Sequence, residues 1–497
     1  MPSHAHSQPR IKNFVNGKFV ESKATSWIPL NDPATGKLRS MVPQSTQSEL
    51  EEATASCATA FRSWREVPVQ QRARVFIKYS EMLRANIDTI ARVITAEQGK
   101  TLADARGDVI RGLEVVEHCI SAPTLMMGET MGNLSAHLDT YSYRQPLGVT
   151  AGICPFVRGG GERRRGASSF GCLSSVVCTH AHGRVVEVGD GARWVHSFLR
   201  HTLRSLSHPR LPLGAPQNFP SMIANWMFPL ANVCGNTMLM KPTEKAPTAA
   251  LMMAEMATAA GLPPGVTNVV NGSVDAVNFI CDAPSIKAIS FVGSNVAGEH
   301  IFDRGTRHGK RVQANLGAKN HGVVMPDADK DATLNALVGA AFGAAGQRCM
   351  ALSVVVLVGD ARGWVEELAA RAAKLRCGPG HLDSTDIGPM ISPEARQRAV
   401  ELISRGVAAG GRLLLDGRKP AVPAGFEGGN YLGATLIADA GPGNPSYDEE
   451  IFGPVLVTVG VETMDDAIAL VNANPYGNGC AIFTASGAAA RKFQHGA

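Results

Sequence analysis

Apolar and polar residues along this chain repeat with the periods of strands and helices. Short strands are predicted within Ile11 to Val20, joined by a turn at Asn16-Gly17, and within Trp27 to Val42. Helical spacing then begins at Ser48 to Trp64, where Ser48 and Glu51 have the spacing of a capping box. It continues through Thr101 to Cys119. The first part of the chain is therefore predicted to be a strand pair followed by amphipathic helices.

From Asn218 onward, strand-like and helix-like segments alternate. Predicted strands are Thr237 to Lys241, Val266 to Val270 and Ile286 to Val292, and predicted helices between them are Ala246 to Ala260 and Asp275 to Cys281. A second section of the same kind opens at Val323 to Pro326. Such alternation predicts an α/β fold with a parallel sheet and helices on both faces.

Two further segments have patterns of their own. Gly128 to Pro146 alternates apolar and polar residues and is predicted to be an exposed hairpin that could pair with another subunit. Phe219 to Met240 is the most apolar long window, but it is interrupted by Asn225, Pro229, Asn232 and Asn236. A bilayer span tolerates these residues poorly, so we predict a buried helix followed by a strand, and no membrane partner.

Composition narrows the class of protein. The chain has 497 residues, 44% apolar and 18% charged, and its ten cysteines follow no repeated spacing. These values indicate a soluble protein of two or three domains in a reducing compartment. The net charge of +5 comes from one segment, Val157 to Gln217, which holds nine Arg, no Lys and only three acidic residues. A nucleic-acid-binding protein is therefore not expected.

Val157 to Gln217 also lacks any hydrophobic period. It contains Gly159-Gly160-Gly161, Arg163-Arg164-Arg165 and five of the 14 His residues. Our interpretation is translated non-coding sequence, from a retained intron or an error in the gene model, and we expect these 61 residues to be disordered. Two alternatives are an RNA-binding Arg/Gly segment and a metal site. The latter would use Cys172, Cys178, His180 and His182, but their spacing matches no standard zinc pattern, so no metal is predicted.

The first candidate for chemistry is Cys349. It lies in Gly346-Gln347-Arg348-Cys349-Met350, between a small-residue helix and the apolar segment Leu352 to Val358. A fixed backbone at such a junction can offer N–H groups to an oxyanion beside a thiolate. The alternative is a buried structural cysteine.

Two further candidates follow predicted strands. Lys241 and Glu244 lie at the carboxyl end of a strand, where ligands bind in open α/β sheets, and could hold the hydroxyls of a ribose. Gly293 and Ser294 lie between a strand and a helix, where free N–H groups favour a phosphate. The alternative for each is an ordinary polar turn.

Five segments, in this order, resemble the NAD(P)-dependent aldehyde dehydrogenase superfamily. They are Pro155-Phe156 with Asn218-Phe219-Pro220, Lys241-Pro242-Thr243-Glu244, Phe291-Val292-Gly293-Ser294, Gly346-Gln347-Arg348-Cys349, and Glu449-Glu450-Ile451-Phe452-Gly453-Pro454. The resemblance implies a Rossmann-type cofactor domain (1–127, 147–156 and 218–317), an α/β catalytic domain (318–497) and an oligomerisation hairpin (128–146). Residues 157–217 form an insertion in that pattern.

Within the superfamily, Asn315 to Ala328 and Phe342 to Ala351 resemble the CoA-acylating methylmalonate-semialdehyde dehydrogenases. Most aldehyde dehydrogenases have a glutamate, the base that activates water, where this chain has Asn315. Water is a poor nucleophile and needs a general base to activate it. A thiol has a pKa of about 8.5 and ionises readily, so Asn315 favours coenzyme A as the acyl acceptor. A neutral packing role for Asn315 is the alternative.

The resemblance also implies roles for single residues. Cys349 is the nucleophile, and the amide of Asn218 stabilises the oxyanion. NAD is held by Lys241, Glu244, Gly293, Ser294, Glu450 and Phe452. The carboxylate of a methylmalonate or malonate semialdehyde binds Arg348 and Arg111, with Arg106 as the competing choice on the same helix.

The family is homo-oligomeric, typically tetrameric, and continues for several tens of residues beyond Ala497. We therefore expect the literal 497-residue chain to assemble poorly and to show weak or no activity. The resemblance implies a mitochondrial matrix or cytoplasmic location, and Met1 to Arg10 has no clear targeting pattern. A hydrolytic aldehyde dehydrogenase and an inactive NAD-binding remnant remain open as alternative functions.

Overall fold

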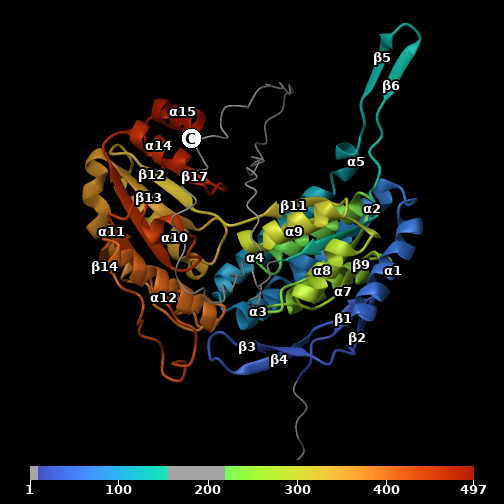
Figure 1. Ribbon diagram of the computed structural model, residues 1–497, viewed down its shortest axis with the longest axis horizontal. Helices are drawn as coiled ribbons and strands as arrows, with labels where there is room; N and C mark the ends of the chain where they lie inside the picture. Colours follow the sequence, from blue (N-terminus) through green and yellow to red (C-terminus); the bar gives the residue numbers. More distant parts are fainter. Residues whose placement is uncertain (1–8, 155–218) are drawn as a thin grey trace, which may run out of the picture. The chain divides into compact units, whose positions relative to one another are not determined.

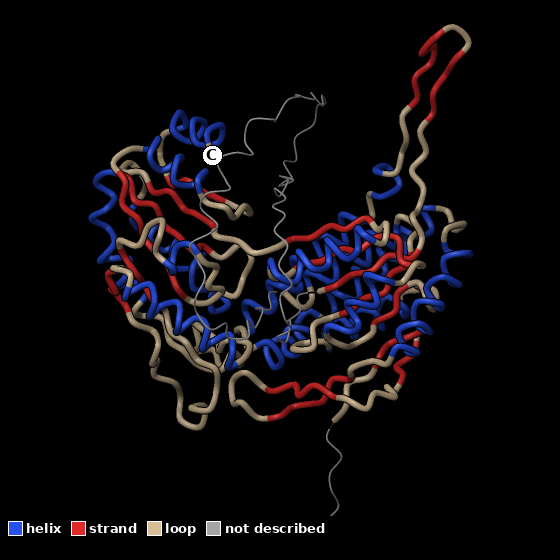
Figure 2. The backbone as a smooth tube through the Cα atoms, in the orientation of Figure 1, coloured by secondary structure: helices blue, strands red, loops and turns tan. Residues whose placement is uncertain are grey.

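The computed structural model describes residues 9–154 and 219–497. The predicted insertion at 157–217, Pro155-Phe156 and Asn218 lie outside the described residues. The strands within the described ranges form two larger sheets and two hairpins (Figures 1 and 2). The larger sheets correspond to the two α/β sections that the sequence predicts.

The first sheet has the strand order β11-β10-β7-β8-β9-β1-β2. Its strands are β1 (Asn13–Val15), β2 (Lys18–Val20), β7 (Val149–Ile153), β8 (Thr237–Lys241), β9 (Thr267–Val269), β10 (Ile286–Val292) and β11 (Arg311–Asn315). Strands β7 to β11 pair in parallel, whereas β1 and β2 form an antiparallel edge. The alternation of strands and helices thus predicted the parallel part correctly.

Helices cover both faces of this sheet, as the side chains of β8 show. Met238 and Met240 pack into one hydrophobic cluster, and Leu239 between them packs into another. The first cluster includes α2 (Val69–Ala85), α3 (Ile87–Gln98), α4 (Leu102–Cys119), α6 (Met222–Val233) and α7 (Thr248–Ala259). The second includes α1 (Gln47–Trp64), α8 (Val274–Asp282) and α9 (Asn295–Arg307). Successive residues of a strand point to opposite faces, so a buried parallel strand is apolar throughout.

The predicted capping box of α1 is wrong by two residues. The N-cap is Thr46, whose hydroxyl accepts from the N–H of Glu49, and the Glu49 carboxylate accepts from the Thr46 N–H at 2.8 Å. Ser48 instead donates to Glu52 on the helix surface. The helix therefore begins at Gln47.

The second sheet has the strand order β14-β15-β16-β13-β12-β17. Its strands are β12 (Asn320–Val324), β13 (Leu352–Val358), β14 (Arg412–Leu415), β15 (Thr435–Ala438), β16 (Val455–Val461) and β17 (Cys480–Phe483). All pair in parallel except β14 at one edge. The accompanying helices are α10 (Lys330–Phe342), α11 (Val365–Ala372), α12 (Pro393–Ala408), α13 (Pro445–Asp448), α14 (Met464–Ala473) and α15 (Gly487–Gly496), with short 3₁₀ turns η2 (Gly343–Gly346) and η3 (Gly359–Trp364). Cys349 lies between η2 and β13.

The remaining strands form hairpins. β3 (Trp27–Asn31) pairs with β4 (Leu38–Pro43), and β5 (Thr130–Ser135) pairs with β6 (Leu138–Tyr141). Every residue of β5 and β6 is exposed, and the hairpin extends away from the neighbouring helix α5 (Ala122–Leu125; Figure 1). The hairpin predicted at 128–146 is therefore present, and its role in oligomerisation stays a prediction.

The apolar window from Phe219 to Met240 forms helix α6, with Pro229 buried inside it, and then strand β8. This confirms the predicted helix and strand. Across residues 9–154 and 219–497, no helix combines the length and the apolar character needed to cross a bilayer.

Candidate active site

The turn before Cys349 has an unusual backbone. Ala344, Ala345 and Gly346 have φ angles of 50°, 54° and 65°, three consecutive left-handed residues of which only the last is glycine. A Cβ on Gly346 would lie 2.2 Å from the carbonyl oxygen of Gly453. Left-handed non-glycine residues persist only where the surroundings enforce them, and they cluster at functional sites.

The carbonyl of Cys349 accepts two hydrogen bonds from side-chain amides. Asn320, at the start of β12, and Asn478, just before β17, each donate to it from Nδ2 at 2.7 Å. Asn320 also accepts from the N–H of Gly479 at 3.1 Å. Two donors on one carbonyl use both lone pairs, and they fix the peptide plane that follows the cysteine. Sequence reasoning did not find these two asparagines.

Cys349 is half-buried and lines a pocket together with Arg348, Glu450 and Phe452. The Glu450 carboxylate accepts from the N–H of Ala318 at 2.8 Å, and burial raises its pKa. Phe452 has a φ of 54°, a second left-handed position beside the nucleophile segment. The predicted cysteine, glutamate and phenylalanine are thus brought together from segments about a hundred positions apart in the chain.

Lys319 is a buried residue at this pocket that sequence reasoning also missed. Its Nζ donates to the carbonyls of Ser446 at 2.6 Å and Glu449 at 2.7 Å. Burial lowers its pKa to about 7. The lysine therefore ties the segment before β12 to the segment that presents Glu450.

Lys241 and Glu244 lie at the carboxyl end of β8, as predicted. Their side chains are 0% and 5% exposed, and Nζ of Lys241 lies 3.6 Å from Oε2 of Glu244. The lysine donates to the carbonyls of Pro242 and Gly272 at 2.7 Å each, and burial lowers its pKa. Oε2 of Glu244 is buried and is ion-paired with Lys241, but it accepts no hydrogen bond from the described residues, and a ligand hydroxyl could donate one.

Gly293 and Ser294 form the turn from β10 into α9. A Cβ on Gly293 would lie 2.4 Å from the ring of Phe291, so a larger residue here would have to displace that buried ring. Ser294 is the N-cap of α9, and its hydroxyl accepts from the N–H of Ala297 at 3.5 Å. The turn therefore leaves backbone N–H groups at a helix start, where an anion is favoured.

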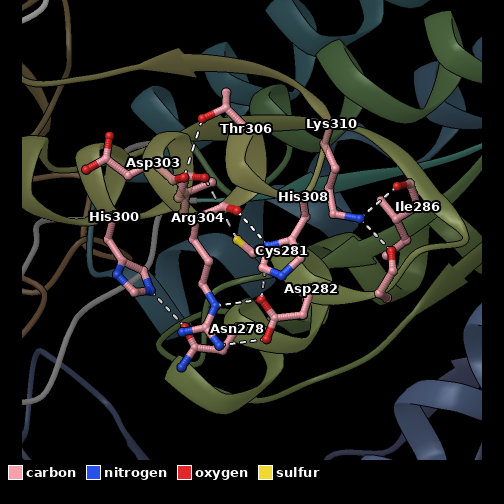
Figure 3. Close-up of polar contacts among 12 residues, drawn as sticks. Asn278, Cys281, Asp282, Ile286, His300, Asp303, Arg304, Thr306, His308 and Lys310 are labelled. Carbon is pink, nitrogen blue, oxygen red and sulfur yellow. Dashed lines mark hydrogen bonds and ion pairs between the residues drawn. The ribbon is translucent and has the colours of Figure 1, made fainter.

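Helix α9 is held in place by polar contacts with α8 and β10 (Figure 3). Arg304 forms a bidentate pair with Asp282, with both N–O distances at 2.6 Å. Lys310, after the helix, donates to the carbonyls of Ala283 at 2.5 Å and Ile286 at 2.8 Å. These contacts hold the carboxyl end of α9 and the residues after it against the end of α8 and the start of β10.

The two arginines predicted for a substrate carboxylate lie near each other. Arg348 donates from Nη2 to the carbonyls of Gly339 and Ala340, while its buried Nε has no hydrogen-bond partner among the described residues. Burial lowers the pKa of Arg348, the carboxylate of Asp104 opposes this shift, and the charge of Arg111 adds to it.

Arg111 is exposed on α4. The competing Arg106 donates to Asp88 at 2.6 Å in a surface ion pair. The charge of Arg111 acts on Arg348, so Arg111 is favoured over Arg106 as its neighbour.

Asn218 lies outside the described residues, but the residues that follow it are tightly held. Nζ of Lys100 lies 4.3 Å from the ring centroid of Phe219 and 3.4 Å from the carboxylate of Asp108. Asp108 in turn accepts from the N–H of Met222 at 2.7 Å. This buried lysine and aspartate are further residues that sequence reasoning missed.

Asn315 is the last residue of β11. It is exposed, and its carbonyl accepts from the N–H of Gly293 at 3.0 Å. Among residues 9–154 and 219–497, no three His, Cys, Asp or Glu side chains gather in a metal-binding arrangement.

A cysteine that follows a strained turn and shares a pocket with a glutamate and a phenylalanine is suited to covalent catalysis. The family model of the aldehyde dehydrogenase family matches residues 19–157 and 212–496. The chain therefore belongs to the aldehyde dehydrogenase family. Residues 158–211, within the predicted insertion, lie outside the match.

Individual relatives indicate a narrower class of enzyme than the family model does. The human mitochondrial acylating methylmalonate-semialdehyde/malonate-semialdehyde dehydrogenase is 50% identical, over 99% of this chain and 81% of its own length. The corresponding probable enzyme of Drosophila melanogaster is 49% identical, over 99% and 82%.

The solved structures that are similar to this chain include proteins named for the same enzyme. A methylmalonate-semialdehyde dehydrogenase from Oceanimonas doudoroffii superposes with a TM-score of 0.84 at 38% identity, covering 98% of this chain and 87% of its own. A protein from Sinorhizobium meliloti assigned to the same enzymes, complexed with NAD, gives 0.84 at 36% identity, covering 99% and 88%. The predicted fold class is confirmed.

Proposed function

We propose that this chain catalyses the NAD-dependent, CoA-acylating oxidation of methylmalonate semialdehyde and malonate semialdehyde. The products are propanoyl-CoA or acetyl-CoA, carbon dioxide and NADH. The observation that carries this proposal is the pocket in which Cys349 meets Glu450, in a chain with Asn315 in place of the water-activating glutamate. Half of its residues are identical to those of human and rat enzymes named for this reaction.

The described residues fit a nicotinamide dinucleotide. The buried Oε2 of Glu244 accepts no hydrogen bond from the described residues and is suited to accept one from a ribose hydroxyl. The amino end of α9 at Ser294 is suited to an anionic phosphate. Glu450 and Phe452 would hold the second ribose and the ring beside Cys349. When bound, NAD supplies the hydride acceptor for the aldehyde.

Cys349 supplies the sulfur nucleophile that bonds to the substrate carbon. Its thiolate attacks the aldehyde carbon, and the carbonyl electron pair moves to the oxygen, which the amide of Asn218 and the Cys349 N–H would stabilise. Removal of hydride from that carbon leaves a thioester on Cys349. The bond between the carboxylate and its neighbouring carbon then breaks, and carbon dioxide leaves. The electron pair of that bond is delocalised into the thioester, and the carbon that carried the carboxylate takes up a proton.

The residue at 315 governs how the thioester is unloaded. Asn315 cannot take a proton from water, so hydrolysis lacks its general base. The thiol of coenzyme A is partly ionised near neutral pH, and its thiolate displaces the Cys349 sulfur without such a base. The acyl group therefore passes to sulfur rather than to water.

Arg348 and Arg111 are suited to the substrate carboxylate. Two neighbouring guanidinium groups can bind it with charge-assisted hydrogen bonds, and the unpartnered Nε of Arg348 offers one donor. The β-carboxylate is the group that leaves, so these residues would orient the bond that breaks.

The test is an NADH assay on the full chain with methylmalonate semialdehyde, with and without coenzyme A. We expect whatever NADH the chain forms to require coenzyme A, and none to form with the Cys349→Ser variant. Equal rates without coenzyme A would instead support a hydrolytic aldehyde dehydrogenase. NAD binding with no NADH from either protein would support an inactive remnant.

We also propose that the β5–β6 hairpin is a surface for homo-oligomerisation, which the family resemblance gives as a tetramer. The hairpin exposes Met131, Leu134, Leu138 and Tyr141, which a neighbouring subunit would cover. A mitochondrial location is proposed from the human and insect relatives, which are named as mitochondrial. Sedimentation of the purified chain and imaging of a tagged full-length protein test these two proposals.

A further inference from the structure

Helix α4 contacts the turn that carries the candidate nucleophile. Oδ2 of Asp104, in its first turn, accepts from the backbone N–H of Ala344 at 3.0 Å, across 240 positions of sequence. The same oxygen accepts from the hydroxyl of Thr101, the N-cap of the helix, at 3.0 Å. One carboxylate thus joins a helix start to the left-handed turn before Cys349.

Helix α14 has a carboxylate at the equivalent position and serves as a comparison for Asp104. In α14 the N-cap is Thr463 and the third residue is Asp466. Its Oδ2 accepts from the Thr463 hydroxyl at 2.7 Å and from the Thr463 N–H at 3.0 Å, which completes a local capping box. Asp104 has the same neighbour and the same helix position, but it binds a backbone N–H from the catalytic turn.

The turn needs such a contact for two reasons. Ala344 and Ala345 are buried, and both have positive φ, which L-residues other than glycine adopt at a cost. An N–H at this buried position would also lack a partner without the carboxylate. The Asp104 bond therefore stabilises the conformation from which Gly346, Gln347 and Cys349 follow.

We propose that Asp104 is a positioning residue that holds the Ala344–Gly346 turn and thereby sets the orientation of the Cys349 thiol. This inference rests on the proposed function, in which Cys349 is the nucleophile. Asp104 acts as a hydrogen-bond acceptor for the backbone and touches no reacting atom. It is therefore expected to affect how fast the sulfur reacts, and not how tightly NAD binds.

The experiment compares Asp104→Ala with Asp104→Asn in the full chain. The readout is the rate at which iodoacetamide alkylates Cys349, followed by mass spectrometry of its peptide, together with kcat and the KM for NAD. We expect Asp104→Ala to change the alkylation rate about tenfold or more and to lower kcat by a similar factor, with the KM for NAD unchanged. Asp104→Asn keeps an acceptor oxygen, so it should stay within about threefold of the wild type.

Two further variants separate positioning from general stability. Asp466→Ala removes the equivalent carboxylate from α14 and should leave Cys349 alkylation unchanged. Ala344→Gly, added to Asp104→Ala, should restore most of the alkylation rate, because glycine adopts positive φ without strain. If Asp104→Ala does not fold, the double variant should fold and react.

The inference is overturned if Asp104→Ala alkylates at the wild-type rate, if Asp466→Ala has an equal effect, or if Ala344→Gly restores nothing. The proposed function fails separately, by a different result. A wild-type protein that still forms NADH after complete alkylation of Cys349 would refute the nucleophile, whatever the alkylation rates of the Asp104 variants.

Discussion

Gly346 lies against the backbone of Gly453 so closely that a Cβ on it would be 2.2 Å from the Gly453 carbonyl oxygen. These glycines belong to the two segments that bring Cys349 and Glu450 into one pocket. Gly346 also has a φ of 65°. The contact therefore sets the spacing between the candidate nucleophile and the glutamate, and any side chain at 346 would force the segments apart.

We accordingly expect Gly346→Ala to abolish NADH formation and to lower the free energy of unfolding by more than the cost of positive φ alone, which is about 1–2 kcal/mol. The additional loss comes from displacement of the Gly453 backbone. Denaturant unfolding and Cys349 alkylation measure the two effects. Gly309→Ala is the matched control, because its φ is 70° and a Cβ there meets nothing within 4 Å. Equal losses from the two variants would contradict the close contact as the cause.

Lys319 gives a prediction about pH. Burial lowers its pKa from 10.5 to about 7 in the folded chain. Between these values the unfolded state holds more protons than the folded state, so this residue's contribution to stability rises with pH from about 7 to about 10.5. We expect the difference in unfolding free energy between wild type and Lys319→Met to rise across that window, by at most about 1.4 kcal/mol per pH unit.

Urea unfolding of both proteins at pH 7.5, 8.5 and 9.5 measures this difference. Lys330→Met, which removes an exposed amine near the start of α10, controls for the loss of one charge. A difference between wild type and Lys319→Met that is constant over this range would show that the lysine does not change its protonation there.

The sequence predicted the strands that end at the site, and it predicted which residues meet there. Thr237–Lys241 and Ile286–Val292 are found as predicted, because a buried parallel strand is a short apolar run that ends in a turn. The resemblance to a known family implied that Cys349, Glu450 and Phe452 act together, and the structure places all three at one pocket. Local patterns alone left Cys349 open between a nucleophile and a buried structural cysteine.

The supporting residues could not be predicted in this way. The amides of Asn320 and Asn478 reach the Cys349 carbonyl from 29 and 129 positions away, and nothing local distinguishes them from surface asparagines. The N-cap of α1 was predicted at the wrong residue for another reason. Thr46 with Glu49 and Ser48 with Glu51 have the same spacing, and only the folded chain selects the first pair.

Arg111 is expected to select the substrate by its charge. Arg111→Leu should raise the KM for methylmalonate semialdehyde about tenfold or more, because a charge-assisted hydrogen bond contributes about 1.5–3 kcal/mol. The KM for propanal, which has no carboxylate, should be unchanged. Steady-state kinetics with both aldehydes make the comparison.

Arg106→Leu decides between the two arginines of α4. Its guanidinium is engaged by Asp88 at the surface, so we expect no selective loss of the acidic substrate. If Arg106→Leu raises the KM for methylmalonate semialdehyde and Arg111→Leu does not, Arg106 is the residue that binds the substrate carboxylate. Equal losses for propanal and the semialdehyde in Arg111→Leu would show that the residue acts on the fold instead.

The residue at 315 is expected to decide which acceptor unloads Cys349. Asn315→Glu places a carboxylate at the exposed end of β11, where it can accept a proton from water. We expect this variant to form NADH without coenzyme A and to release free acid, with a rise of at least about tenfold in the CoA-independent rate, since general-base catalysis contributes about 100-fold or more. Product analysis by mass spectrometry measures the ratio of acid to thioester.

Two controls isolate the general base from other effects of the substitution. Asn315→Gln lengthens the side chain without a carboxylate, and Gln313→Glu adds the same charge two residues earlier, on the same face of the strand. Neither should gain hydrolysis, because neither puts a proton acceptor at position 315. If Gln313→Glu hydrolyses as fast as Asn315→Glu, local negative charge is the cause. If Asn315→Glu remains CoA-dependent, the asparagine is a packing residue and the choice of acceptor is made elsewhere in the pocket.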